Sequence, residues 1–341
     1  MQKPVAISYA VFALLLVLVA ALHLATPLLA ALFCYLALRK LTFWKKKWIG
    51  ITLFLVLVAV VFSGSVFFLR RAVIVLPEIV STAIPMVVRF AETHGVELPF
   101  TDMESLRTVA LESVRDTLGH LGKYVKIATK ESVFLVIGVV VAVGIFFNPD
   151  FEPGLKKRPA VPNLYSFYTA RIRERFTSFY KCFEIVIGAQ LIISAINTAL
   201  TAIFVYSFSL PYATVVLILT FICGLLPIIG NIISNSIIIG IAFTISPQMA
   251  GYALVFLVTI HKLEYFLNSR IIGGRIDHPM WLTLLALIIG ERLMGISGMI
   301  LAPVILSFIK VEMKKIELAP SGFLEPPQLE KPIARELVET R

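Results

Sequence analysis

Charged residues are scarce in this chain, and their scarcity indicates its class. Only 15% of the 341 residues are Asp, Glu, Lys or Arg, whereas about a quarter of a soluble domain is charged. Hydrophobic residues make up 58% of the chain, and its mean hydropathy is +0.90. This composition excludes an ordinary soluble globular protein. It also excludes a disordered chain, which would contain too few apolar residues to form a core.

Cysteines and catalytic motifs are also scarce. Cys34, Cys182 and Cys223 are far apart and form no CxxC pair, so no zinc site, redox motif or complete disulfide framework is indicated. The sequence contains no HExxH motif, nucleophile elbow or phosphate-binding loop. We therefore expect no enzymatic activity and no cofactor. The basic loops lack interleaved aromatic residues, so we expect no nucleic-acid partner.

The sequence is rich in long stretches that carry no charge. About 20 apolar residues cross a bilayer as a helix, and backbone polar groups in lipid must be satisfied internally. A transmembrane β-barrel would instead need alternating polar residues. The uncharged stretches are residues 4–38, 48–69, 132–149, 185–261, 278–290 and 293–309. They predict an all-α polytopic integral membrane protein with about eight helical passes, some of them broken or re-entrant.

The positive charges indicate how the chain is oriented, because cytoplasmic loops are rich in Lys and Arg. The whole net charge of +10 is accounted for by residues 1–47 and 148–183, which hold 13 basic and 3 acidic residues. We expect both segments on the cytoplasmic side of a bacterial inner membrane, with the N-terminus also cytoplasmic. Residues 4–38 then form a hairpin with its apex at His23 to Pro27. A single long tilted helix with the N-terminus outside is the alternative.

Charge and periodicity divide the chain into segments. Between Leu106 and Val125 apolar residues recur every three to four positions, which predicts an amphipathic helix within a charged, extracytoplasmic insertion. That insertion either acts as a cap, a gate or an oligomer contact, or is a packed helix without a ligand. The expected segments are an N-terminal hairpin with a third span (1–69), the insertion (70–131), a returning span (132–147), a basic cytosolic segment (148–183), a transport-type membrane domain (184–311) and a cytosolic tail (312–341).

A predicted helix break in the second half of the chain is a candidate site. Pro227 and Gly230 interrupt the hydrogen-bond ladder, and the half-helix ends at such breaks form ion or substrate sites in transporters. Asn231 and Asn235 are four residues apart, so they share one helix face. The alternative is a kink whose asparagines only join neighbouring helices.

Polar and ionisable residues at membrane depth are further candidates, because burying them is costly and usually serves a function. Gln190 and Asn197 are seven residues apart on one predicted helix, and they either line a polar path or join helices. Glu264, Arg270 and His278 belong either to that path or to a solvated loop at a membrane face. Glu291, beside Arg292, is interpreted as the tip of a hairpin, with an inward-facing pair as the alternative.

Several motifs together resemble the autoinducer-2 exporter family of permeases. The matching motifs are Ile187-Gly188-Ala189-Gln190, the segment from Gly224 to Asn231, Arg270-Ile271-Ile272-Gly273, His278-Pro279 and the segment from Gly295 to Pro303. The layout of the N-terminal third is similar too, so the resemblance extends to about residue 312. Ile228 and Asn231 stand where the family often has an aromatic residue and a proline. Asn231 restores a backbone donor and adds an amide.

The resemblance implies transport of a small signalling molecule, but members are also proposed to be monovalent cation/proton antiporters. The first hypothesis is therefore a carrier or exporter of a small hydrophilic solute, with Gln190, Asn231, Asn235 and His278 as hydrogen-bonding contacts. The second is an antiporter in which Glu264 or Glu291 exchanges a proton for a cation. The third is a non-transporting membrane scaffold. The expected partners are the solute or ion and the lipid bilayer, and homo-oligomerisation is left open.

Overall fold

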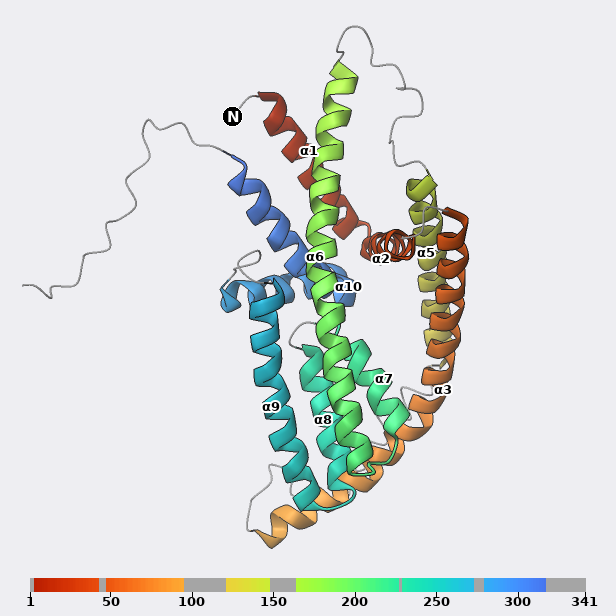
Figure 1. Cartoon of the computed structure of the whole chain (residues 1–341), viewed down its shortest axis with the longest axis vertical. Helices are drawn as coiled ribbons and strands as arrows, with labels where there is room; N and C mark the ends of the chain where they lie inside the picture. The colour runs from red at the N-terminus through yellow and green to blue at the C-terminus, as the bar shows by residue number, and fades with distance from the viewer. Residues whose placement is uncertain are drawn as a thin grey trace, which may run out of the picture.

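The structure is a computed structural model that describes residues 3–42, 47–94, 121–147, 164–226, 229–272 and 279–316. The regular structure in those residues is helical, which confirms the predicted all-α fold (Figure 1). The helices are α1 (Lys3–Ala21), α2 (Ala25–Leu41), α3 (Lys47–Thr93), α5 (Leu121–Phe147), α6 (Leu164–Ser207), α7 (Ala213–Cys223), α8 (Ile229–Phe243), α9 (Pro247–Ile272) and α10 (Met280–Lys314).

The described helices include both membrane-spanning lengths and shorter pieces. Three of them contain stretches long and apolar enough to cross a membrane, in α3 (Trp48–Val75), α6 and α10 (Trp281–Lys314), and the bent pair α1–α2 would make a fourth. Ser132–Phe147, Ala213–Cys223 and Gly230–Phe243 are apolar but shorter. Full-length and broken helices therefore occur together, as expected for a polytopic membrane protein. The total of about eight passes stays a prediction.

Residues 3–42 form two helices rather than one. The chain bends by 114° between α1 and α2, and His23 at the bend has a φ of 54°. Pro27 lies in the first turn of α2, where its missing N–H removes no intrahelical bond. The break thus falls where the hairpin apex was predicted, and the single continuous helix does not form. The bend is an open one rather than a tight antiparallel hairpin.

Transitions between apolar and charged sequence occur inside continuous helices. The segment boundaries expected at residues 69, 131, 183 and 311 lie within α3, α5, α6 and α10 respectively. Arg, Lys and Glu are good helix formers, so a change from apolar to charged residues does not by itself end a helix. Most of the amphipathic helix expected from Leu106 to Val125 lies outside the described residues.

The α6–α9 bundle is the part of the fold that positions the candidate site. Helix α7 has 11 residues and α8 has 15, or about 16 and 22 Å at 1.5 Å per residue, so neither crosses a 30 Å bilayer core alone. They lie side by side and pack against α6 and α9, while the second half of α3 curves across the same end of the bundle (Figure 1). Their packed core includes Phe204, Val216, Ile238 and Ala253.

Close backbone contacts occur where α8 follows α7 and where α10 is interrupted. A Cβ at Gly230 would overlap the carbonyl of Cys223, where α8 returns along α7. In α10, Gly295 adopts φ 62° and ψ −147° and divides the helix. Gly290 and Gly298 then meet so closely that a Cβ on either would overlap the other's carbonyl. The region around residue 295 therefore folds back on itself, as the uncharged runs on either side of Glu291-Arg292 predicted.

Candidate functional site

The candidate site lies near the middle of the membrane-spanning part of α6. The uncharged stretch begins at Ile185, and α6 ends at Ser207. At 1.5 Å per residue, Asn197 is about 18 Å from Ile185 and about 15 Å from Ser207. This places Asn197 half-way through a hydrocarbon core of about 30 Å, where polar side chains need a partner.

Side chains of α6 satisfy the free end of α7. Gln190 Nε2 donates to the carbonyl of Gly224 over 2.5 Å, and Ser194 Oγ donates to the carbonyl of Phe221 over 2.7 Å. The last carbonyls of a helix have no partner within that helix, and water is absent from the lipid core. These two bonds therefore allow α7 to end inside the membrane.

The buried carboxylate of Glu264 forms the centre of the site. Glu264 of α9 is only 8% exposed, and its Oε2 accepts a hydrogen bond of 2.6 Å from Nδ2 of Asn231. Asn231 belongs to the first turn of α8, where the helix dipole favours negative charge. His261 Nδ1 lies 3.9 Å from Glu264 Oε2, and the His261 side chain is 69% exposed. The closest partner of this carboxylate is thus a neutral amide.

A small cavity adjoins this carboxylate at the meeting point of α6, α7, α8 and α9. It encloses about 10 Å³, which is about the room that one water molecule needs. Oδ1 of Asn197 and Oγ1 of Thr220 are buried there without a hydrogen-bond partner. Its lining residues, here called the polar cluster, are Asn197, Thr201, Thr220, Asn231, Ser234, Asn235, Leu257, Ile260, His261 and Glu264.

The polar cluster can bind a proton or a small oxygen-seeking cation. A carboxylate accepts a proton, and carboxylate, amide and hydroxyl oxygens are ligands for hard cations. In the part of the chain that the structure describes, no three His, Cys, Asp or Glu side chains come together. A site for a tightly chelated transition metal is therefore not indicated by the described residues.

Comparison with known proteins identifies the family. The sequence profile described as AI-2E family transporter matches residues 7–317. The chain belongs to the AI-2E transporter family. Membership agrees with the resemblance found in the motifs, and together with the apolar helices it supports a multi-pass membrane protein.

Two curated relatives from Bacillus subtilis (strain 168) match parts of this AI-2E family member. The protein named "Putative transport protein YdbI" is 31% identical over 135 residues, which are 39% of this chain and 39% of that relative. "Putative transport protein YueF" is 33% identical over 104 residues, 30% of this chain and 28% of that relative. The chain thus matches about two fifths or less of each relative's length. Neither name specifies a substrate.

Most of the site residues predicted from the sequence of this AI-2E family member lie at the bundle. The structure brings Asn197, Asn231, Asn235 and Glu264 to the same cavity. Gln190 and Gly230 lie at the α7–α8 hairpin beside it. Glu264 does not lie in a solvated loop, because α9 continues to Ile272. The burial of Glu264 therefore agrees with the interpretation as part of a polar path.

Of the other predicted residues, only Glu291 has a described side chain. Pro227 and His278 lie outside the described residues, as does the side chain of Arg270. The side chain of Glu291 is 53% exposed, and its Oε2 lies 4.0 Å from Nε of Arg292. Glu291 lies one helical turn before the break at Gly295, and its exposure agrees with the interpretation as a hairpin tip. Its role in a polar path stays a prediction.

Several lining residues of the cavity were not predicted. Thr201, Ser234 and His261 each lie one helical turn from a predicted residue on the same helix, and i to i+3 or i+4 spacing was the signal that could have found them. Thr220 gave no such signal, because it is surrounded by apolar residues in α7.

A second buried polar group, also missed, joins α1, α6 and α10. Glu312 is 3% exposed and forms an ion pair with Arg175 that is buried on both sides. The hydroxyl of Tyr9 donates to Glu312 Oε2 over 3.0 Å, and Lys315 Nζ lies 2.6 Å from Oε1. The predicted tail from residue 312 therefore begins inside α10, with a buried Glu312 followed by exposed residues. Arg175, expected in a cytosolic segment, is part of a helix-packing contact.

Proposed function

We propose that this AI-2E family member exchanges a proton for a monovalent cation at Glu264. The observation that carries the proposal is a buried carboxylate, bonded to a neutral amide beside a cavity about the size of one water molecule. Helix α6, which lines the same cavity, is apolar enough to cross a membrane. Burial of an ionisable group in a membrane is expensive and is typical of proton and ion pathways. The second hypothesis from the sequence required such a carboxylate.

The proposed exchange balances charge at one carboxyl group. Glu264 in its acid form releases a proton to one side of the membrane. The resulting carboxylate, with Oδ1 of Asn197 and Oγ1 of Thr220, then binds one monovalent cation. The cation leaves when a proton returns to Glu264, so the buried site carries the same net charge in both loaded states. This avoids the high cost of an uncompensated charge in a low-dielectric environment.

A carrier for a small hydrophilic solute is a second candidate, favoured by the amides of Asn197, Asn231 and Asn235 around the same cavity. A volume of about 10 Å³ leaves no room for an organic solute in this conformation. Solute binding would require the α7–α8 hairpin to separate from α6, with loss of the bonds made by Gln190 and Ser194. The geometry therefore favours an ion over a solute.

The test measures ion-driven proton movement in proteoliposomes loaded with a pH-sensitive dye. We expect pulses of Na⁺ or K⁺ to move protons through the wild-type protein. Glu264→Gln should lower that movement at least tenfold, because glutamine keeps the side-chain shape but cannot exchange a proton. Glu291→Gln is the matched control, since the Glu291 side chain is exposed and does not line the cavity, and it should retain wild-type flux.

Two outcomes would reject the ion exchange. One is wild-type proton movement in Glu264→Gln, and the other is flux no greater than that of empty liposomes. A parallel assay with a radiolabelled hydrophilic solute separates the second candidate. Solute uptake that survives Glu264→Gln but is lost in Asn231→Leu would support the carrier instead.

A further inference from the structure

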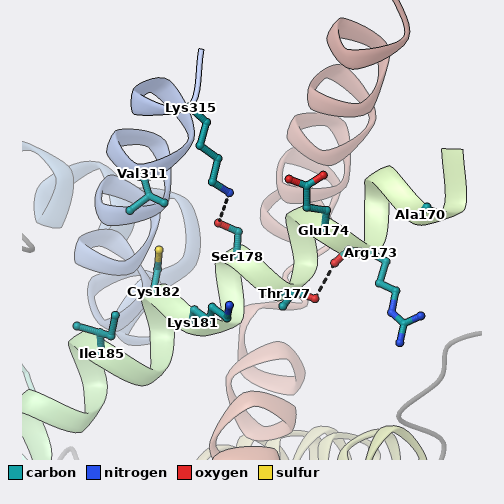
Figure 2. Close-up of a pocket in the computed structure, with 10 residues that line it drawn as sticks. All are labelled: Ala170, Arg173, Glu174, Thr177, Ser178, Lys181, Cys182, Ile185, Val311 and Lys315. Carbon is teal, nitrogen blue, oxygen red and sulfur yellow. Dashed lines mark hydrogen bonds between the residues drawn. The ribbon is translucent and has the colours of Figure 1, made fainter. Parts of the chain in front are cut away.

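A large open pocket lies between α6 and α10, away from the polar cluster. It has a volume of about 600 Å³, within the range of small-molecule sites. Figure 2 shows the residues of α6 that line it, together with Val311 and Lys315 of α10. The lining residues are Ala170, Arg173, Glu174, Thr177, Ser178, Lys181, Cys182, Ile185, Val311 and Lys315.

The pocket lies where both of its helices pass from apolar to charged sequence. The uncharged stretch of α6 begins at Ile185, and that of α10 ends at Ile309, just before Lys310. Ile185 is 38% exposed and Ile309 is 46% exposed. The inner end of the pocket is therefore apolar and level with the edge of the hydrocarbon, and its outer end is charged. Phospholipid head groups occupy this level of a bilayer.

The charges of the pocket favour an anion. Three of its lining side chains, those of Arg173, Lys181 and Lys315, are cations. Its carboxylate, Glu174, is already paired, because Arg171 Nη1 lies 3.3 Å from its Oε2. Lys315 shares the buried Glu312 with Arg175, so those three groups carry one net positive charge. Its Nζ also lies 3.3 Å from the hydroxyl of Ser178 (Figure 2).

We propose that this pocket binds the phosphate-bearing head group of an anionic phospholipid. Basic pockets between membrane helices on the cytoplasmic side recognise such head groups, and α6 here begins in the segment whose positive charge predicts that side. Arg173 and Lys181 contact the phosphate, and their methylene stems lie along the pocket wall. The acyl chains continue past Ile185 into the bilayer. The site is independent of Glu264.

The test compares lipid retention by the full-length protein. Protein purified in mild detergent is mixed with phosphatidylglycerol or phosphatidylcholine, and native mass spectrometry counts the retained lipid. The test variant is Arg173→Gln/Lys181→Gln, and the matched control, Arg70→Gln/Arg292→Gln, removes two exposed cations elsewhere. We expect wild-type and control protein to retain phosphatidylglycerol in preference to phosphatidylcholine. The test variant should bind phosphatidylglycerol roughly tenfold more weakly, since each cation near an anionic lipid surface contributes measurably.

Three results would overturn the proposal. Phosphatidylglycerol binding could be the same in the test variant and the wild type. Phosphatidylcholine could be retained as well as phosphatidylglycerol, which would show that the head-group charge is not recognised. Alternatively, soluble glycerol 3-phosphate could bind the lipid-free protein as tightly as phosphatidylglycerol does, as measured by calorimetry, which would identify a free phosphate ester as the ligand. Because Arg173 and Lys181 are exposed, their replacement leaves the helix core intact.

Discussion

At the scale of single residues, the described part of the chain contains two buried carboxylates with opposite surroundings. Glu312 is surrounded by cations, since Arg175 and Lys315 both pair with it, and Arg175 Cζ also lies 4.0 Å from the centre of the Tyr9 ring. Glu264 has a neutral amide as its closest partner. A carboxylate held by two cations is fixed as a charge, which suits a structural contact between α1, α6 and α10. One held by an amide can gain or lose a proton more readily, which suits exchange.

Replacement of Glu312 tests the structural role at this scale. Glu312→Gln should reduce the free energy of unfolding by about 3–5 kcal/mol, because Arg175 would remain as an uncompensated buried charge. Arg175→Met/Glu312→Leu should cost less than the single change, since the whole pair is replaced by apolar groups of similar volume. Thermal unfolding in detergent, followed by tryptophan fluorescence, measures both. Equal stability of Glu312→Gln and wild type would contradict the buried pair.

At the scale of helices, function depends on where helices are interrupted. Helices α7 and α8 are too short to cross the membrane, and their meeting point lies beside α6, where Gln190 and Ser194 bind the end of α7. The hairpin places Asn231 opposite Glu264. The turn at Gly295 likewise interrupts α10, and it brings the backbone of Gly290 into contact with the backbone of Gly298. Backbone contact at such positions requires the absence of a side chain.

Alanine substitutions in α8 test the closure of the hairpin. Gly230→Ala should lower stability by roughly 1–3 kcal/mol and reduce transport, because the added methyl group would overlap the carbonyl of Cys223. Gly240→Ala is the matched control in the same helix. A Cβ there meets no atom within 4 Å, and alanine favours a helix by up to about 1 kcal/mol over glycine. The prediction fails if both variants unfold and transport alike.

At the scale of the whole molecule, the fold has two distinct ends. The first residues of α6 and the last residues of α3 lie at opposite ends of the fold (Figure 1). The two larger buried cores of the described residues are separate: Phe12, Phe183 and Val304 belong to one, and Val205 and Ile241 to the other. This arrangement agrees with a chain that crosses a bilayer, and the charge bias predicts that the start of α6 is cytoplasmic.

Cysteine accessibility tests this orientation. Tyr165→Cys at the start of α6 and Glu92→Cys at the end of α3 place thiols at exposed positions. In intact spheroplasts a membrane-impermeant maleimide should label residue 92 only, and residue 165 should react after permeabilisation. The unmodified chain, which contains Cys34, Cys182 and Cys223, provides the background. Labelling of both positions from the same side would contradict the predicted topology.

The sequence by itself determined that the chain belongs in a membrane, that it is helical and where its first helix breaks fall. Uncharged stretches require a lipid environment, and backbone bonds in lipid require helices. The breaks near Pro27 and Gly230 follow from the local geometry of proline and glycine. These properties depend on each residue and its near neighbours along the chain, so the order of residues is sufficient to predict them.

Only the tertiary structure decided which polar residues meet. Asn231 and Glu264 are 33 positions apart, and Arg175 and Glu312 are 137 positions apart. Helical periodicity gives each residue a face but not the neighbour of that face, because helix pairing depends on packing between distant segments. For the same reason the place of Thr220 in the cavity and the burial of Glu312 could not be predicted. The site is a property of four helices together, and no one of them contains it.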